Sequence, residues 1–188
     1  METTDGARPH SYLNRMIRAA KLDVTLYKEV EQDRGSLFQA MGVVILSSLC
    51  AGVGGVGRGE GGFALILLGT VSALAGWYIW AFLTYYVGTR FLPEPQTQAD
   101  YGQLLRTIGF SSAPGMIRIL GLVPEMTIIV FFMASVWMLV AMVIAVRVAL
   151  DYSNNLRAVA VCAVGWLVQI LLIMLLVTLS GGVPELPM

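Results

Sequence analysis

Long apolar segments, separated by short polar ones, make up most of the chain after residue 36. A transmembrane helix needs about 20 consecutive apolar residues, and segments of this length follow one another along the sequence. The pattern therefore predicts an all-α integral membrane helical bundle of about five transmembrane helices. The predicted spans are residues 37–57, 63–87, 103–123, 126–150 and 157–180, followed by a short C-terminal tail at 181–188.

The third predicted span, residues 103–123, contains Pro114 and carries two charges, Arg106 and Arg118. Proline removes a backbone donor and kinks or breaks a helix. Irregular backbone is tolerated at membrane depth only where protein or trapped water satisfies its polar groups. The segment therefore either crosses as a broken, protein-buried helix or enters the membrane and returns on the same side.

Residues 1–36 are predicted to form a cytoplasmic tail and an amphipathic helix. Apolar residues recur there at spacings of three and four, the period of a helix with one apolar face; they are Leu13, Ile17, Ala20, Val24 and Tyr27. The segment is too charged to span a bilayer. It is expected either to lie on the membrane as an interfacial helix or to pack under the bundle as a soluble cap.

Composition and charge agree with a membrane protein of defined orientation. Hydrophobic residues make up 57% of the chain and charged residues 13%, whereas a soluble domain carries about 25% charged residues. Lys and Arg in short loops mark the cytoplasmic side. With five spans, ten Lys and Arg residues lie on the same side of the membrane as the N-terminus and two lie on the opposite side. With four spans, the numbers are nine and three. The charges thus favour five spans, a cytoplasmic N-terminus and an external C-terminus.

Small and aromatic residues mark the expected helix-packing faces and one membrane interface. Small residues four positions apart allow close helix approach; they are Ser47, Ala51 and Gly55, and then Ala141, Ala145 and Ala149. Tyr78, Tyr85 and Tyr86 are predicted to form an interface belt, because amphipathic rings favour the headgroup level. A cofactor or pigment pocket is the alternative for these rings. Arg147 and Asp151 are four apart and could pair on one helix face.

The sequence contains no recognisable catalytic, metal or cofactor motif. The only histidine is His10, outside the bundle, and no nucleophile motif or phosphate-binding glycine loop is present. Cys50 and Cys162 lie within apolar runs and are expected to be buried free thiols. Acidic neighbours offset the basic residues of the N-terminal helix, which gives nucleic-acid binding no support. We therefore expect a protein that is not an enzyme and holds no cofactor or metal.

The central and C-terminal part resembles the Yip (Ypt-interacting protein) family of polytopic membrane proteins, in its bacterial form, over roughly residues 35–180. The residues that carry the resemblance are Trp77, Trp80, Arg106, Gly109, Phe110, Ser111, Pro114, Trp137, Arg147 and Arg157. The resemblance implies five membrane helices, a cytoplasmic N-terminus and a place in the bacterial inner membrane. Eukaryotic members contact small GTPases through an Asp-Leu-Tyr-Gly-Pro-like stretch. Residues 32–37 here read Gln-Asp-Arg-Gly-Ser-Leu, so GTPase binding is not carried over.

These features predict a non-enzymatic membrane scaffold or accessory subunit of a larger membrane assembly. Its expected partners are membrane lipids and other membrane protein subunits or further copies of itself. One alternative is a small-solute or ion pathway through the broken segment, with Ser111 and Ser112 lining a cavity and Arg106 and Arg118 attracting anions. In the competing interpretation, that segment is a kinked packing helix, and Arg106 and Arg118 snorkel to opposite interfaces of the membrane. Another alternative is lipid or pigment handling.

Overall fold

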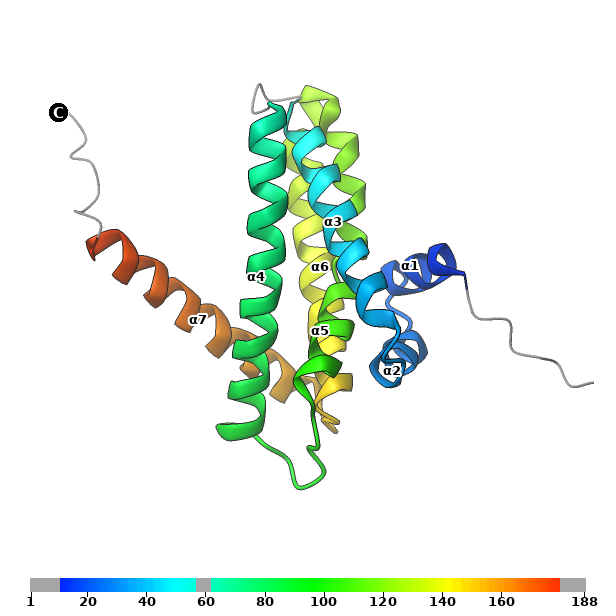
Figure 1. Cartoon of the computed structure of the whole chain (residues 1–188), viewed down its shortest axis with the longest axis vertical. Coiled ribbons are helices and arrows are strands. Elements are labelled where there is room, and N and C mark those ends of the chain that lie inside the picture. Colours follow the sequence, from blue (N-terminus) through cyan, green and yellow to red (C-terminus); the bar gives the residue numbers. More distant parts are fainter. Residues whose placement is uncertain (1–10, 57–61, 180–188) are drawn as a thin grey trace, which may run out of the picture.

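The computed structural model describes residues 11–56 and 62–179, and every regular element within them is helical. The all-helical prediction is thus confirmed for this part of the chain. In order, the elements are α1 (Tyr12–Ala20), α2 (Val24–Gln32), α3 (Ser36–Gly55), α4 (Phe63–Arg90), α5 (Tyr101–Phe110), the 3₁₀ helices η2 (Ala113–Leu122) and η3 (Pro124–Met126), α6 (Thr127–Ala149) and α7 (Asn155–Leu179) (Figure 1). The predicted tails at 1–10 and 181–188 lie outside the described residues.

Three helices in the described residues are long and apolar enough to cross a membrane. They are α3, α4 and the combined stretch Pro124–Ala149, which joins η3 to α6. The stretch Asn155–Leu171 of α7 is a further apolar helix, shorter than these three. These helices support an integral membrane protein.

The long helices α3, α4 and α6 stand side by side as a bundle, and α5 and η2 follow one another along it (Figure 1). Ten residues of α-helix rise about 15 Å, and ten residues of 3₁₀ helix rise about 20 Å. End to end, α5 and η2 therefore reach about 35 Å, against a hydrocarbon core of about 30 Å. The broken segment is long enough to match the height of the bundle.

The N-terminal region forms two helices, although its apolar periodicity predicts one. Leu22 adopts a left-handed backbone with φ 62°, which ends α1. The side chain of Asp23 then accepts a hydrogen bond from the backbone N–H of Thr25 at 2.9 Å and caps the start of α2. This N-cap preference of aspartate separates the two helices and lets α2 fold back beside α1.

Glycines allow the broken segment to lie tightly against α3. A Cβ at Gly109 would approach that of Ala40 to 2.7 Å and the Ala40 backbone to 3.2 Å. Gly54 lies against the Arg118 carbonyl and Gly115 against Ser47 and Met138, both too closely for a side chain. The predicted small residues Ser47 and Gly55 are buried nearby and Ala51 is half-buried, while Ala141, Ala145 and Ala149 of α6 are fully buried.

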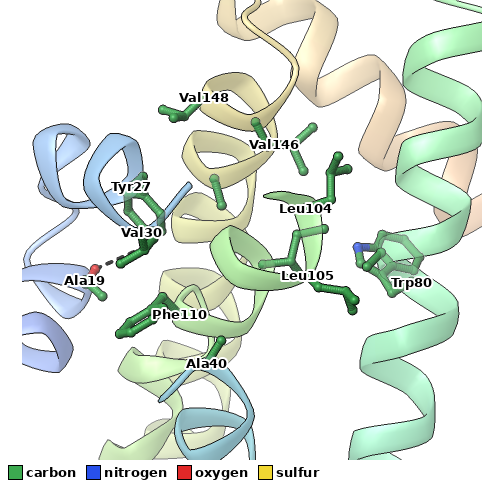
Figure 2. Packing of buried hydrophobic residues seen from close by; sticks show 14 of the residues in the cluster. Ala19, Tyr27, Val30, Ala40, Trp80, Leu104, Leu105, Phe110, Val146 and Val148 are labelled. Atoms are coloured by element: carbon green, nitrogen blue, oxygen red, sulfur yellow. Dashed lines mark hydrogen bonds between the residues drawn. The ribbon is translucent and has the colours of Figure 1, made fainter. Parts of the chain in front are cut away.

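A hydrophobic core joins the N-terminal helices to the bundle. Figure 2 shows Tyr27 and Val30 of α2 on one side of this core and Trp80 of α4 on the other, with Leu104 and Leu105 of α5 between them. Tyr27, Val30, Leu104 and Leu105 are at most 5% exposed, and Trp80 is 8% exposed. Residues far apart in the sequence therefore share one packed interior, centred on α5.

The end of α6 differs from the expected arrangement of Arg147 and Asp151. The helix ends at Ala149, and Asp151 takes a left-handed conformation with φ 52°. Arg147 instead donates a hydrogen bond to Asn155 Oδ1 at 2.8 Å. The predicted Arg147–Asp151 pair is wrong because the two residues do not share a helix.

Candidate functional site

The break between α5 and η2 is held by hydrogen bonds within the chain. Pro114 stands in the first turn of η2, where its missing N–H costs no helical hydrogen bond. The hydroxyl of Ser111 donates to the Ile108 carbonyl at 2.7 Å, and the Ser112 N–H donates to the Gly109 carbonyl at 3.2 Å. The chain thus passes the proline within the bundle, as irregular backbone at membrane depth requires.

Arg106 of α5 holds the C-terminal end of α2. It is only 6% exposed, and its Nε donates to the Val30 carbonyl at 3.0 Å while Nη2 donates to the Glu31 carbonyl. The last carbonyls of a helix lack intrahelical partners, and a cation there is favoured. Arg106 therefore neither snorkels to an interface nor lines the cavity described below.

Trp137 of α6 makes a matching contact with α1. Its indole N–H donates to the carbonyl of Ala20, the last residue of α1, at 2.8 Å. Arg15 of α1 is 8% exposed and donates to Glu29 Oε1 at 2.9 Å and to Asp33 Oδ2 at 2.8 Å, which ties α1 to the other N-terminal helix. The two N-terminal helices are thus fixed to each other and to the bundle.

Two carboxyl groups of the N-terminal helices titrate away from their ordinary values in opposite directions. Hydrogen bonds from Thr25 and Arg18 lower the pKa of Asp23 to about 2. Burial, reinforced by the charge of Asp151, raises the pKa of Glu31 to about 7. Gln103 of α5 donates to Glu31 Oε1 at 3.2 Å. The carboxyl group with the raised pKa therefore lies at the contact of α2 with α5.

A cavity of about 400 Å³ lies among α3, α4, α6, α7 and the broken segment. Its polar lining residues are Ser47, Ser48, Ser111, Ser112, Arg118, Ser135 and Gln169, and its apolar lining includes Trp77, Trp80, Met138 and Trp166. The structure therefore brings Ser111, Ser112 and Arg118 together at one cavity. Arg106, the other predicted anion-attracting residue, is engaged at α2.

No group of three or more His, Cys, Asp or Glu side chains able to hold a metal ion occurs within residues 11–56 and 62–179. The cavity lining likewise offers neither a histidine nor a carboxylate. The geometry of the cavity therefore suits the binding of a ligand, through hydroxyl, amide and guanidinium groups that face an apolar wall.

Comparison with known protein families places these features in context. The sequence model of the Yip1 domain family matches residues 26–177 of the chain. The chain belongs to the Yip1 domain family. No curated protein and no solved structure gives a match to the chain. The Yip1 domain match runs from within α2 to within α7, so it includes Arg106, the broken segment and all residues that line the cavity.

The aromatic side chains of the Yip1 domain divide between its surface and its interior. Tyr78 and Tyr86 are 42% and 47% exposed, and Tyr85 is half-buried. Trp77 is 5% exposed, and its indole N–H donates to the Leu105 carbonyl of α5 at 3.0 Å. The exposed tyrosines are available for an interface belt, which stays a prediction, whereas Trp77 joins α4 to α5.

A polar network at one end of the Yip1 domain holds the loop after α4 to the turn before α7. Glu94 accepts from the backbone N–H of Ser153 at 3.0 Å and lies 3.2 Å from Arg157 Nε. The Ser153 N–H is the main cause of the lowered pKa of Glu94. Tyr152 adds a hydrogen bond from its hydroxyl to the Leu92 carbonyl at 2.8 Å. Sequence reasoning singled out Arg157 in this network but missed Glu94, which no local pattern distinguishes from a loop acid.

Proposed function

We propose that this Yip1 domain protein is a non-enzymatic integral membrane scaffold or accessory subunit with five membrane-spanning helices. The length and composition of α3, α4 and α6 support three of the spans. The combined reach of α5 and η2, about 35 Å, supports a fourth. The 25 residues of α7 are assigned to the fifth, because an inclined helix needs more than the about 20 residues of an upright crossing.

The distribution of charge supports a cytoplasmic N-terminus in this proposal. The end of α4, the helix α5, the end of α6 and the start of α7 lie in the lower half of the bundle in Figure 1. Arg90, Arg106, Arg147 and Arg157 belong to these stretches. Basic residues concentrate on the cytoplasmic side, so this end faces the cytoplasm, and the bacterial inner membrane is the proposed location.

The observation that carries the scaffold role is the course of α7. It starts beside α4, where Gly165 lies against the Trp80 ring, and then leaves the bundle at a steep angle (Figure 1). Its outer part exposes Leu167, Ile170 and Leu171 to between 53% and 58%. A helix that departs from its own bundle offers a long face to another membrane helix, either of a second copy or of a different subunit.

The experiment is a mass measurement on the protein extracted from its native membrane in mild detergent, followed by identification of whatever accompanies it. The proposal predicts a particle larger than one 20.4 kDa chain after the detergent contribution is subtracted. The α7 double variant Leu167→Ala/Ile170→Ala should shift the particle toward the single chain. The matched α4 variant Leu65→Ala/Leu68→Ala, at positions that are each 63% exposed, should leave it unchanged. A wild-type protein that is strictly monomeric would contradict the proposal.

A small-solute pathway is the second candidate, because Ser111, Ser112 and Arg118 line one cavity. Liposomes that contain the purified protein test it directly. Solute flux that exceeds that of empty liposomes and falls in Arg118→Gln would favour this candidate. Flux equal to that of empty liposomes would remove it and leave the scaffold role in place.

A further inference from the structure

The cavity described above contains one cation and no carboxylate to balance it. Of its lining residues only Arg118 carries a charge. No ion pair joins Arg118 to a carboxylate among residues 11–56 and 62–179. A guanidinium taken out of water without a counter-charge is costly. An anionic ligand in the cavity would balance the charge of Arg118.

The guanidinium of Arg118 is held in place but is far from saturated with hydrogen bonds. Its Nη2 donates to the Ser135 hydroxyl at 3.0 Å, and its Cζ lies 5.6 Å from the centroid of the Phe131 ring. Its Nε is buried and has no hydrogen-bond partner among the described residues. Arginine offers five N–H donors in a planar fork that suits phosphate and carboxylate. The remaining donors are thus available to a ligand.

Other lining groups add donors of the kind that an oxyanion needs. Trp80 is 8% exposed, and its indole Nε1 is buried without a hydrogen-bond partner in the part of the chain that the structure describes. The hydroxyl-bearing residues Ser47 and Ser112 line the same cavity. A buried donor left without an acceptor costs about 1–3 kcal/mol. An oxyanion with several acceptor oxygens would satisfy more than one of these groups.

The cavity reaches the outside of the bundle on the flank between α4 and α6. Five of its lining residues are exposed: Gly76 of α4, Ser135 and Leu139 of α6, and Trp166 and Gln169 of α7. Where α4 and α6 cross a membrane, this opening faces lipid rather than water. The volume of about 400 Å³ falls in the range of small-ligand sites, about 300–1,000 Å³, and the apolar side chains around the opening suit acyl chains.

We propose that this cavity binds a phosphate group, that of an anionic phospholipid entering from the side between α4 and α6, with Arg118 as its anchor. Phosphate fits better than a carboxylate because it offers more acceptor oxygens to the guanidinium fork and to the other donors that line the same cavity. The inference rests on the bundle spanning a membrane and not on the scaffold role. Failure of the lipid measurement below would leave the mass measurement on α7 unaffected.

The test titrates the purified full-length protein in nonionic detergent and follows its tryptophan fluorescence, since Trp77, Trp80 and Trp166 line the cavity. The probes are dihexanoyl phosphatidylglycerol, dihexanoylglycerol, which lacks the phosphate, and inorganic phosphate. The expected result is saturable binding of the phosphatidylglycerol and none of the dihexanoylglycerol. Arg118→Gln should weaken binding about tenfold or more. Arg90→Gln, at an exposed arginine, should leave binding unchanged.

A second pair of variants keeps the test decisive if Arg118→Gln does not fold. Gly76 lines the cavity, and a Cβ added there would meet nothing within 4 Å. Gly76→Leu should therefore fill the opening without disturbing the fold and abolish phosphatidylglycerol binding. Gly69→Leu is the matched control, since Gly69 has equal space two turns away on α4 and does not line the cavity.

Three results would overturn all or part of the inference. Absence of saturable binding by both phosphate-bearing probes would overturn the site. Equal affinities in Gly76→Leu and Gly69→Leu, or in Arg118→Gln and Arg90→Gln, would overturn its location. Saturation by inorganic phosphate alone, with the same dependence on Arg118, would support the phosphate site but overturn the lipid as its source.

Discussion

Replacement of Arg106 by methionine is the most informative test of how the N-terminal helices are held. The change removes both donors that reach the end of α2, at the Val30 and Glu31 carbonyls, and keeps a long apolar side chain. A hydrogen bond from a charged group contributes about 1.5–3 kcal/mol. The loss of stability is smaller than the sum of two such hydrogen bonds for two reasons. The variant no longer buries a charge, and Ser36 Oγ still donates to the Val30 carbonyl at 2.9 Å. We expect a net loss of about 2–3 kcal/mol.

Trypsin digestion in detergent measures this loss as local opening of the N-terminal helices. Lys21 and Lys28 are exposed and become cleavable when α1 and α2 detach from the bundle. Because about 1.4 kcal/mol is a tenfold change in an equilibrium, cleavage in Arg106→Met should be about 30- to 150-fold faster. Arg90→Met, at an exposed position, should be cleaved like the wild type. Equal cleavage rates in Arg106→Met and the wild type would refute the role assigned to Arg106.

Two further predictions concern packing and pH. Gly109→Ala should lower the free energy of unfolding by about 2 kcal/mol or more, because its Cβ would collide with the Cβ of Ala40 and press on the Ala40 backbone. Gly69→Ala, in open space, should be neutral or stabilising by up to about 1 kcal/mol. Thermal unfolding in detergent measures both changes. The pKa of Glu31 is raised to about 7, against an ordinary value of 4.5. Its contribution to the free energy of unfolding is therefore fully present below pH 4.5 and is lost as the pH rises through 7. Glu31→Gln should therefore stabilise the fold by up to about 3 kcal/mol at pH 8 and by almost nothing at pH 4, and a gain that does not depend on pH would contradict this explanation.

The sequence predicted the long helices well because their signal is local. The helices α3, α4 and α6 begin and end within a few residues of the stretches expected from apolar length, and Pro114 marked the position where the third stretch breaks. The break between α1 and α2 was missed because apolar spacing continues across it. Asp23 followed by Thr25 is an N-cap pattern that could have revealed it.

The roles of single polar residues depended on contacts that no sequence pattern encodes. Arg106 and Arg118 lie on the same broken segment and look alike in the sequence. One satisfies carbonyls of α2, more than 70 positions away, and the other lines a cavity. The near-neutral pKa of Glu31 likewise arises from burial against α5. The steep departure of α7 had no sequence signal either, because its apolar residues suit any orientation within a membrane.

The placement of both arginines depends on the segment from Tyr101 to Leu122 running from one membrane face to the other. Single cysteines at Gln98 and Glu125, both exposed, flank this segment in a background with Cys50→Ala and Cys162→Ala. A membrane-impermeant maleimide applied to intact cells, before and after permeabilisation, measures the side on which each cysteine lies. We predict that Glu125→Cys reacts on intact cells and that Gln98→Cys reacts only after permeabilisation. Reaction of both only after permeabilisation would show that the segment returns to the cytoplasmic side, and it would contradict the five-span bundle.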